Sequence, residues 1–144
     1  MKREINYVYD EEEDDLESMI LGEPEVLFNT DVIFSMQNFK TLENILGFSQ
    51  AEWAEILHLS LRTLQRYLKD ESDFDGPQAE LLHQLKMLTD AGLMQFNDAG
   101  GFVRWLRTDK EVLGKSLDFS TLKTITGIRM LRDELGRMAE GVYI

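Results

Sequence analysis

Two helix-start signals follow one another within residues 48–69, and they constrain the fold more than any other feature of this sequence. In Ser49-Gln50-Ala51-Glu52, the Ser hydroxyl and the Glu carboxylate can accept hydrogen bonds from each other's backbone N–H groups, which is the capping box of a helix N-terminus. Phe48 and Trp53 flank it at the positions of a hydrophobic staple. His58-Leu59-Ser60 is then expected to form a turn in which His58 adopts a positive φ. Ser60 can cap a second helix. The segment therefore predicts a helix-turn-helix.

The second of these helices, Ser60 to Lys69, is expected to expose a cationic face that contains no acid. Arginine can donate two hydrogen bonds to guanine and glutamine can bind adenine, so such a helix suits the major groove of DNA. A purely structural pair of helices is the alternative, because the same pattern also occurs in proteins that never contact DNA. The candidate DNA-binding residues are Gln50, Ser60, Arg62, Thr63, Gln65, Arg66 and Lys69.

Most of the remaining chain has apolar residues spaced by three and four, which predicts helices and no strands. Gly100-Gly101 and Thr108-Asp109-Lys110 are expected to form turns, and Gly127 to break a helix. The fold class is therefore predicted to be all-α, with a helix-turn-helix domain followed by a small helical domain. The helices are expected from Phe34 to Gly47, from Gly76 to about Phe96, over 102–106, over 117–126, and from Ile128 to Gly141.

Acidic residues are concentrated at the start of the chain, where residues 1–31 carry −9 of the net charge of −12. The run Asp10 to Asp15 is six like charges, which favour an extended, solvated segment. A hard-cation site is the alternative, but the run lacks the alternating ligands and the turn glycine of an EF-hand loop. Three segments are thus expected: 1–33, acidic and of uncertain order; 34–75, the helix-turn-helix domain; and 76–144, a small helical domain.

The residue types present do not suggest an enzyme. The sequence has no cysteine, and we find no nucleotide-binding or hydrolase motif in it. His58 and His83 are explained by local structure, because no neighbouring motif supplies the partner that would orient a general base. We therefore expect no catalytic residue, no cofactor and no metal. A membrane-spanning helix needs about 18 consecutive apolar residues, and no apolar run in the sequence approaches this length, so we expect no membrane partner. The first residues are acidic where a secretory signal would be apolar, so we expect a cytoplasmic protein.

Two parts of the chain carry further short motifs. Ser60 to Arg66 has the form Ser-x-x-Thr-Leu-x-Arg. The motifs of the C-terminal half are, in chain order, Phe102 to Arg107, Leu113-Gly114, Leu122, Thr126-Gly127, Leu135 to Met138 and Gly141-Val142-Tyr143. Residues 45–69 are similar to the Xre-type helix-turn-helix, and the C-terminal motifs resemble the toxin-binding domain that follows it in the Xre/MbcA/ParS antitoxins. The resemblance spans roughly residues 45–144 and implies that residues 76–144 form a helical dimerisation and toxin-binding domain.

This resemblance implies an antitoxin that binds and blocks a RES-domain toxin, an enzyme that degrades NAD. It also implies a homodimer that represses its own operon by binding operator DNA, alone or with the toxin. In that family the last helix and the tail approach the active-site cleft of the toxin. Carried over by position, the toxin-binding residues are Arg137, Met138, Gly141, Val142, Tyr143 and Ile144.

Two other functions remain open at this point. The first is a stand-alone transcription regulator whose C-terminal half only dimerises, which needs no toxin partner. The second is an acidic decoy, in which residues 10–15 compete for a basic surface of another molecule.

Overall fold

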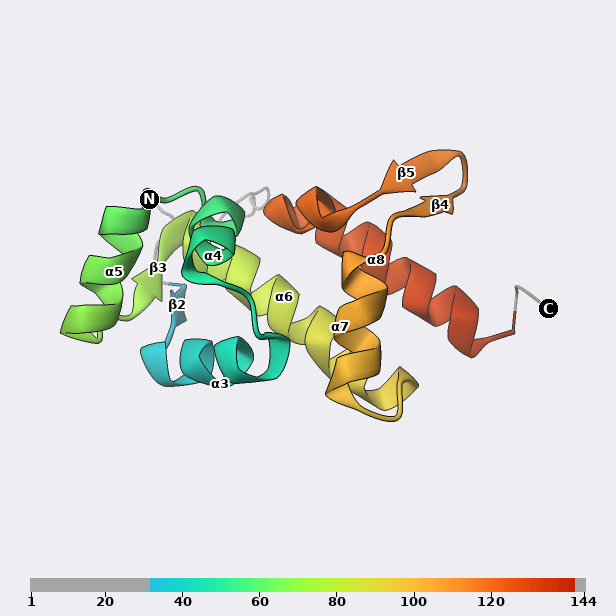
Figure 1. Cartoon of the computed structure of the whole chain (residues 1–144), viewed down its shortest axis with the longest axis horizontal. Helices are drawn as coiled ribbons and strands as arrows, with labels where there is room; N and C mark the ends of the chain where they lie inside the picture. The colour runs from blue at the N-terminus through green and yellow to red at the C-terminus, as the bar shows by residue number, and fades with distance from the viewer. Residues whose placement is uncertain (1–31, 142–144) are drawn as a thin grey trace, which may run out of the picture. The chain divides into compact units, whose positions relative to one another are not determined.

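The computed structural model describes residues 32–141, which belong to one compact unit (Figure 1). The acidic run of residues 10–15 and the three C-terminal residues lie outside the described range. Within that range the protein is mostly helical, in agreement with the predicted all-α class. The elements are β2 (Ile33–Phe34), α3 (Met36–Leu46), α4 (Gln50–Leu57), α5 (Leu61–Asp70), β3 (Phe74–Asp75), α6 (Gly76–Gln95), α7 (Ala99–Arg107), β4 (Lys110–Val112), β5 (Lys115–Leu117), the 3-10 helix η1 (Phe119–Lys123) and α8 (Ile125–Ala139).

The predicted C-terminal end of α3 and both predicted ends of α6 are confirmed, but the predicted start of the first helix at Phe34 is wrong. Phe34 belongs to β2, which pairs with β3 although no strand was expected, and α3 begins at Met36. Ser35 precedes α3, and its side chain accepts a hydrogen bond from the Asn38 N–H. Gly47 follows α3 in the left-handed conformation, with φ 68°, as expected for a helix-ending glycine. Pro77 lies in the first turn of α6, where its missing N–H leaves no hydrogen bond unmade.

Helix α6 runs between the group of elements around α3 and β3 and the group around α7 and α8 (Figure 1). It contacts elements of both groups, namely β2, β3, α3, α7 and α8. It packs along α8 and also contacts the short antiparallel pair of β2 and β3, in which Phe34 is paired with Phe74. The buried apolar residues of α3 to α8 form a single cluster. The division at residue 75 remains a prediction, and this core includes residues from both sides of it.

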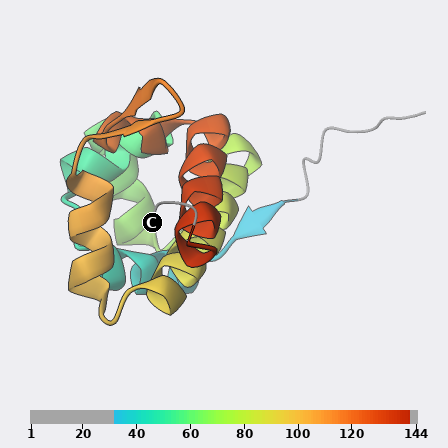
Figure 2. The same cartoon turned by 90° about the vertical axis from the view of Figure 1, so that its right-hand side faces the viewer.

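The segment between α7 and α8 differs from the prediction. Residues 110–117 form an antiparallel hairpin of β4 and β5, where a turn at 108–110, the start of a helix at Leu117 and no strand were expected. At its tip, Leu113 and Gly114 have φ of 52° and 81°, which fits a two-residue hairpin turn of the kind that matches strand twist. In Figure 2, α7 and α8 lie on opposite sides of the view, and the hairpin and η1 pass between them at one end.

Two predictions about glycines were also wrong. Gly127 does not break a helix but lies in the first turn of α8, where it is buried. A Cβ there would stand 2.1 Å from the Thr121 carbonyl oxygen, so η1 can approach α8 closely only because this residue has no side chain. Gly100 and Gly101 lie inside α7, which starts earlier than expected because Asp98 caps it by accepting a hydrogen bond of 2.7 Å from the Gly101 N–H.

Candidate nucleic-acid interface

Helix α4 begins with the predicted capping box. The Ser49 hydroxyl accepts from the Glu52 N–H at 3.1 Å, and the Glu52 carboxylate accepts from the Ser49 N–H at 2.9 Å. The helix ends at His58, whose φ of 58° is the left-handed conformation that the turn requires. Trp53 is fully buried, and the centre of its ring lies 4.8 Å from the centre of the Phe39 ring. This face of α4 is therefore packed in the core.

Helix α5 begins at the second predicted N-cap. The Ser60 hydroxyl accepts from the Thr63 N–H at 3.0 Å and donates to the Thr63 hydroxyl at 2.9 Å. Leu64 is fully buried and Tyr67 and Leu68 are partly buried, so α5 packs on the core along one side. Ser60 and the half-buried Thr63 thus form the cap of α5, and their contact with DNA remains a prediction.

The face of α5 that points away from Leu64 is cationic. Arg62, Arg66 and Lys69 are all exposed and follow the spacing of one helical face. The ion pairs found within residues 32–141 involve other side chains. Gln65 is also exposed, and its amide donates a hydrogen bond of 3.3 Å to the Gln50 side chain at the start of α4. The structure therefore brings together the predicted residues Gln50, Arg62, Gln65, Arg66 and Lys69 at the exposed surface of α4 and α5.

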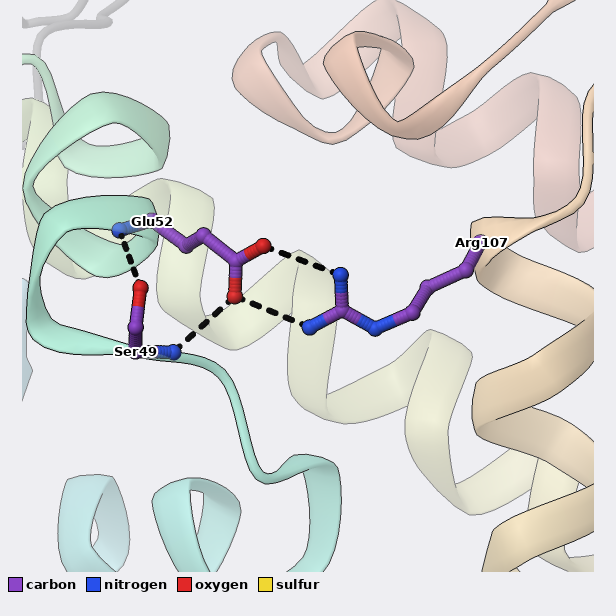
Figure 3. Close-up of polar contacts among 3 residues, drawn as sticks. All are labelled: Ser49, Glu52 and Arg107. Atoms are coloured by element: carbon purple, nitrogen blue, oxygen red, sulfur yellow. Dashed lines mark hydrogen bonds and ion pairs between the residues drawn. The ribbon is translucent and has the colours of Figure 1, made fainter.

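An ion pair that was not predicted from sequence lies at the start of α4. The Arg107 guanidinium at the end of α7 makes two hydrogen bonds to the Glu52 carboxylate, of 2.8 and 2.9 Å (Figure 3). Mainly because of these bonds, the pKa of Glu52 falls to about 2, and the pKa of Arg107 is raised. No local pattern could have predicted the pair, since its partners lie in different helices and far apart in the sequence.

The two histidines are held by main-chain carbonyl groups. The Nε2 atom of His58 lies 2.7 Å from the Lys123 carbonyl oxygen, and that of His83 lies 2.9 Å from the Ile33 carbonyl oxygen. The His83 ring also packs edge-on against Phe34. His58 lies in the predicted turn, whereas the ring contacts of both histidines reach carbonyl groups 65 and 50 residues away in the sequence and were not expected. Across residues 32–141 there is no group of three or more His, Cys, Asp or Glu side chains with the geometry of a metal site.

Three of the six predicted toxin-binding residues lie in the described part of the chain. Arg137 contacts Glu134 on α8 with hydrogen bonds of 3.0 and 3.2 Å, Met138 is half-buried, and Gly141 is exposed with φ 72°. The contacts of these residues with a toxin remain predictions. The other three, Val142, Tyr143 and Ile144, lie outside the described residues.

Trp105, on α7, is half-buried beside Phe96 and Phe102, and the Lys110 ammonium lies 4.5 Å from the centre of its ring. Burial against this ring lowers the pKa of Lys110. Trp105 therefore packs against the core without being fully buried.

The comparisons with known proteins leave the family undecided. No family model matches the chain, and the search of curated proteins returned no match. In none of the helices described between residues 32 and 141 is there an apolar stretch long enough to cross a membrane.

Proposed function

We propose that this protein is a DNA-binding antitoxin of the RES–Xre type, in which α5 reads operator DNA and the C-terminal end blocks a RES-domain toxin. One observation carries the DNA-binding part: Arg62, Arg66 and Lys69 form an exposed cationic face on a short, capped helix that follows another helix after a tight turn. That arrangement supports insertion of α5 into a major groove.

The chemistry of each side chain suggests a role in this complex. Arg62 lies in the first turn of α5, the part of a recognition helix that approaches the base edges, and arginine can donate two hydrogen bonds to guanine. The amide of Gln65, oriented by Gln50, suits adenine. Lys69, in the last turn, suits a phosphate, because a lysine ammonium neutralises charge without reading sequence. A homodimer would place two such helices on two half-sites one helical turn apart.

Alanine substitutions on α5 test this proposal. We expect Arg62→Ala and Arg66→Ala to weaken binding to the DNA upstream of the protein's own gene by about 1–3 kcal/mol each, if they contact bases. Arg129→Ala, which removes the same charge from an exposed position on α8, is the matched control and should have a much smaller effect. Gel shifts or fluorescence anisotropy would measure these affinities at two salt concentrations. Equal losses in all three variants would show that binding depends only on total charge and would remove α5 as the reader.

The neutralising part of the proposal rests on the resemblance of residues 102–143 to the toxin-binding domain of the Xre/MbcA/ParS antitoxins. In this mechanism, Arg137 and Met138 contact the toxin near its cleft, and the apolar end of the chain, Gly141 to Ile144, obstructs the entry of NAD. The antitoxin then needs no chemistry of its own, because exclusion of the substrate is sufficient.

Co-expression with a RES-domain toxin encoded beside this gene tests that mechanism. The full chain should restore growth, whereas a chain that ends at Glu140 should bind the toxin more weakly and protect less. Equal protection by both chains would remove the tail from the mechanism. The stand-alone regulator makes a different prediction: full DNA affinity without a second protein, and no toxic gene beside this one.

A further inference from the structure

The ion pair between Glu52 and Arg107 joins the N-terminal turn of α4 to the last residue of α7 (Figure 3). The Glu52 carboxylate has two tasks at once, because the oxygen that accepts from the Ser49 N–H also accepts from Arg107. The side chains of Glu52 and Arg107 are 29% and 41% exposed, so the pair lies at the surface but is partly shielded from water. It is also bidentate, which fixes the direction as well as the distance of the contact.

Two aromatic rings hold the guanidinium in place as well. The Cζ atom of Arg107 lies 5.3 Å from the centre of the Phe48 ring and 4.9 Å from the centre of the Phe119 ring. These two rings meet edge to face at 4.9 Å, and Phe48 packs on Trp53 in the core. Arginine therefore meets a carboxylate and two rings in one orientation, an arrangement that the flexible ammonium of lysine cannot reproduce.

A short chain of contacts connects this ion pair to the cationic face of α5. Glu52 is the third residue of α4, whose first residue, Gln50, holds the amide of Gln65 on α5. The turn between the two helices is closed by the Leu59 N–H, which donates to the Ala54 carbonyl at 2.9 Å. Helix α5 is seated on the core by Leu64 and by the partly buried Tyr67 and Leu68, and its N-terminal half is also held by these contacts with α4.

We propose that Arg107 is a positioning residue for DNA recognition: by holding Glu52 against α7, it sets the orientation in which α4 presents α5 to DNA. This proposal rests on the DNA-binding function proposed above. Arg107 contacts no base in this scheme. Its effect reaches the DNA through Glu52, Gln50 and Gln65.

The direction in which Glu52→Gln changes the affinity for DNA distinguishes a positioning role of the ion pair from a purely electrostatic effect. Glu52→Gln removes a negative charge near the DNA-binding surface, which by electrostatics alone should strengthen binding to the phosphate backbone. Glutamine also retains an oxygen that can accept from the Ser49 N–H, so the capping box can persist. If orientation matters, the same substitution should instead weaken specific binding. Glu55→Gln is the matched control, because it removes the same charge from the same helix, where the Glu55 carboxylate lies 3.4 Å from the Lys123 ammonium and is not paired with Arg107.

The experiment measures the affinity of the full chain and its variants for the DNA upstream of its gene, and for a scrambled duplex of the same composition. We expect Glu52→Gln and Arg107→Lys each to lower specific affinity by about 3- to 10-fold while binding to the scrambled duplex changes little. Glu55→Gln should bind both duplexes as well as the wild type or better. The double variant Glu52→Gln/Arg107→Lys should lose no more than either single variant, since both break the same contact.

Different results would overturn different claims. If Glu52→Gln strengthens binding to both duplexes as Glu55→Gln does, and Arg107→Lys binds as the wild type, then Arg107 does not position α5. That outcome leaves the proposed function intact, provided that Arg62→Ala and Arg66→Ala still weaken binding. If those two α5 variants bind normally, the DNA-binding function itself fails. Thermal unfolding of each variant, followed by circular dichroism, ensures that every affinity is measured on folded protein.

Discussion

The substitution Gly127→Ala tests the packing of η1 against α8, which is the part of the fold that sequence reasoning described least well. Gly127 is buried, and an added Cβ would meet the Thr121 carbonyl oxygen at 2.1 Å and the Thr121 Cγ2 at 2.8 Å. The carbonyl belongs to the backbone of η1, which cannot move aside as a side chain would. Asp118 holds η1 in place by accepting from the Ser120 N–H, and Leu122 fixes it in the core.

The expected loss follows from two opposing effects. Replacing glycine by alanine in a helix contributes at most about 1 kcal/mol, and less in a first turn. Overpacking of a filled core costs about 1–3 kcal/mol, and a contact with backbone belongs at the upper end of that range. We therefore expect Gly127→Ala to lower the free energy of unfolding by about 2 kcal/mol, which corresponds to a fall in Tm of about 5–10 °C for a domain of this size.

Gly136→Ala, on the same helix, is the control for this prediction. A Cβ at position 136 would have no atom within 4 Å outside its own helix and chain neighbours, so only the gain in helix propensity remains. This variant should raise the free energy of unfolding by about 0.5–1 kcal/mol. Urea denaturation followed by far-UV circular dichroism measures both values. If the two substitutions shift stability in the same direction by similar amounts, the close approach of η1 to Gly127 does not exist as described.

Two further predictions concern the ion pair and the hairpin. The pKa of Glu52 is lowered from 4.5 to about 2. The ionised carboxylate should therefore contribute fully to the free energy of unfolding above about pH 5, and this contribution should disappear as the pH falls through 2. Because Arg107 and Glu52 are partly exposed, solvent screening limits this contribution to about 1–2 kcal/mol. The stability difference between the wild type and Glu52→Gln should therefore shrink between pH 5 and 2 in urea denaturation, and a constant difference would contradict the assignment. Leu113→Asn should raise the free energy of unfolding by about 1 kcal/mol, because the leucine has a φ of 52° that asparagine adopts more easily. The leucine side chain is 78% exposed, so little packing should be lost. A lower stability in urea denaturation would show that the contacts of the leucine outweigh this backbone strain.

The parts of the fold that could be predicted are those with local signals. The capping box at Ser49, the N-cap at Ser60 and the left-handed Gly47 each depend on atoms within a few residues of one another, so the sequence displays them directly. The same is true of the cationic side of α5, because the burial of Leu64 determines which residues of so short a helix face away from the core.

The parts that could not be predicted depend on residues that are distant in sequence. Gly127 is needed because Thr121 approaches it in space, and the sequence alone cannot distinguish this requirement from that of a helix-breaking glycine. The β4–β5 hairpin was missed because its strands are too short to show an alternating pattern. The contact between Arg107 and Glu52 was not predicted because the two residues lie in different helices.

The candidate site could be predicted from the sequence only in part, because some of its features are local and others depend on distant residues. The position of the α5 face follows from local helix geometry, whereas the orientation of α5 depends on contacts made through α4 and α7. The toxin-binding assignment depends on the family resemblance, and Arg137 is the charged residue of that set in the described range. Its contact with Glu134 would orient the guanidinium before any partner binds.

The central claim is that α5 is the surface that contacts DNA, and an NMR titration tests it most directly. Isotopically labelled protein would be titrated with the DNA upstream of its gene while backbone amide shifts are followed. We predict that the largest changes map to the start of α4 and to residues 60–69, with smaller changes in α7 and α8. Saturable binding whose changes cluster on α7 and α8 and leave residues 60–69 unchanged would contradict the claim.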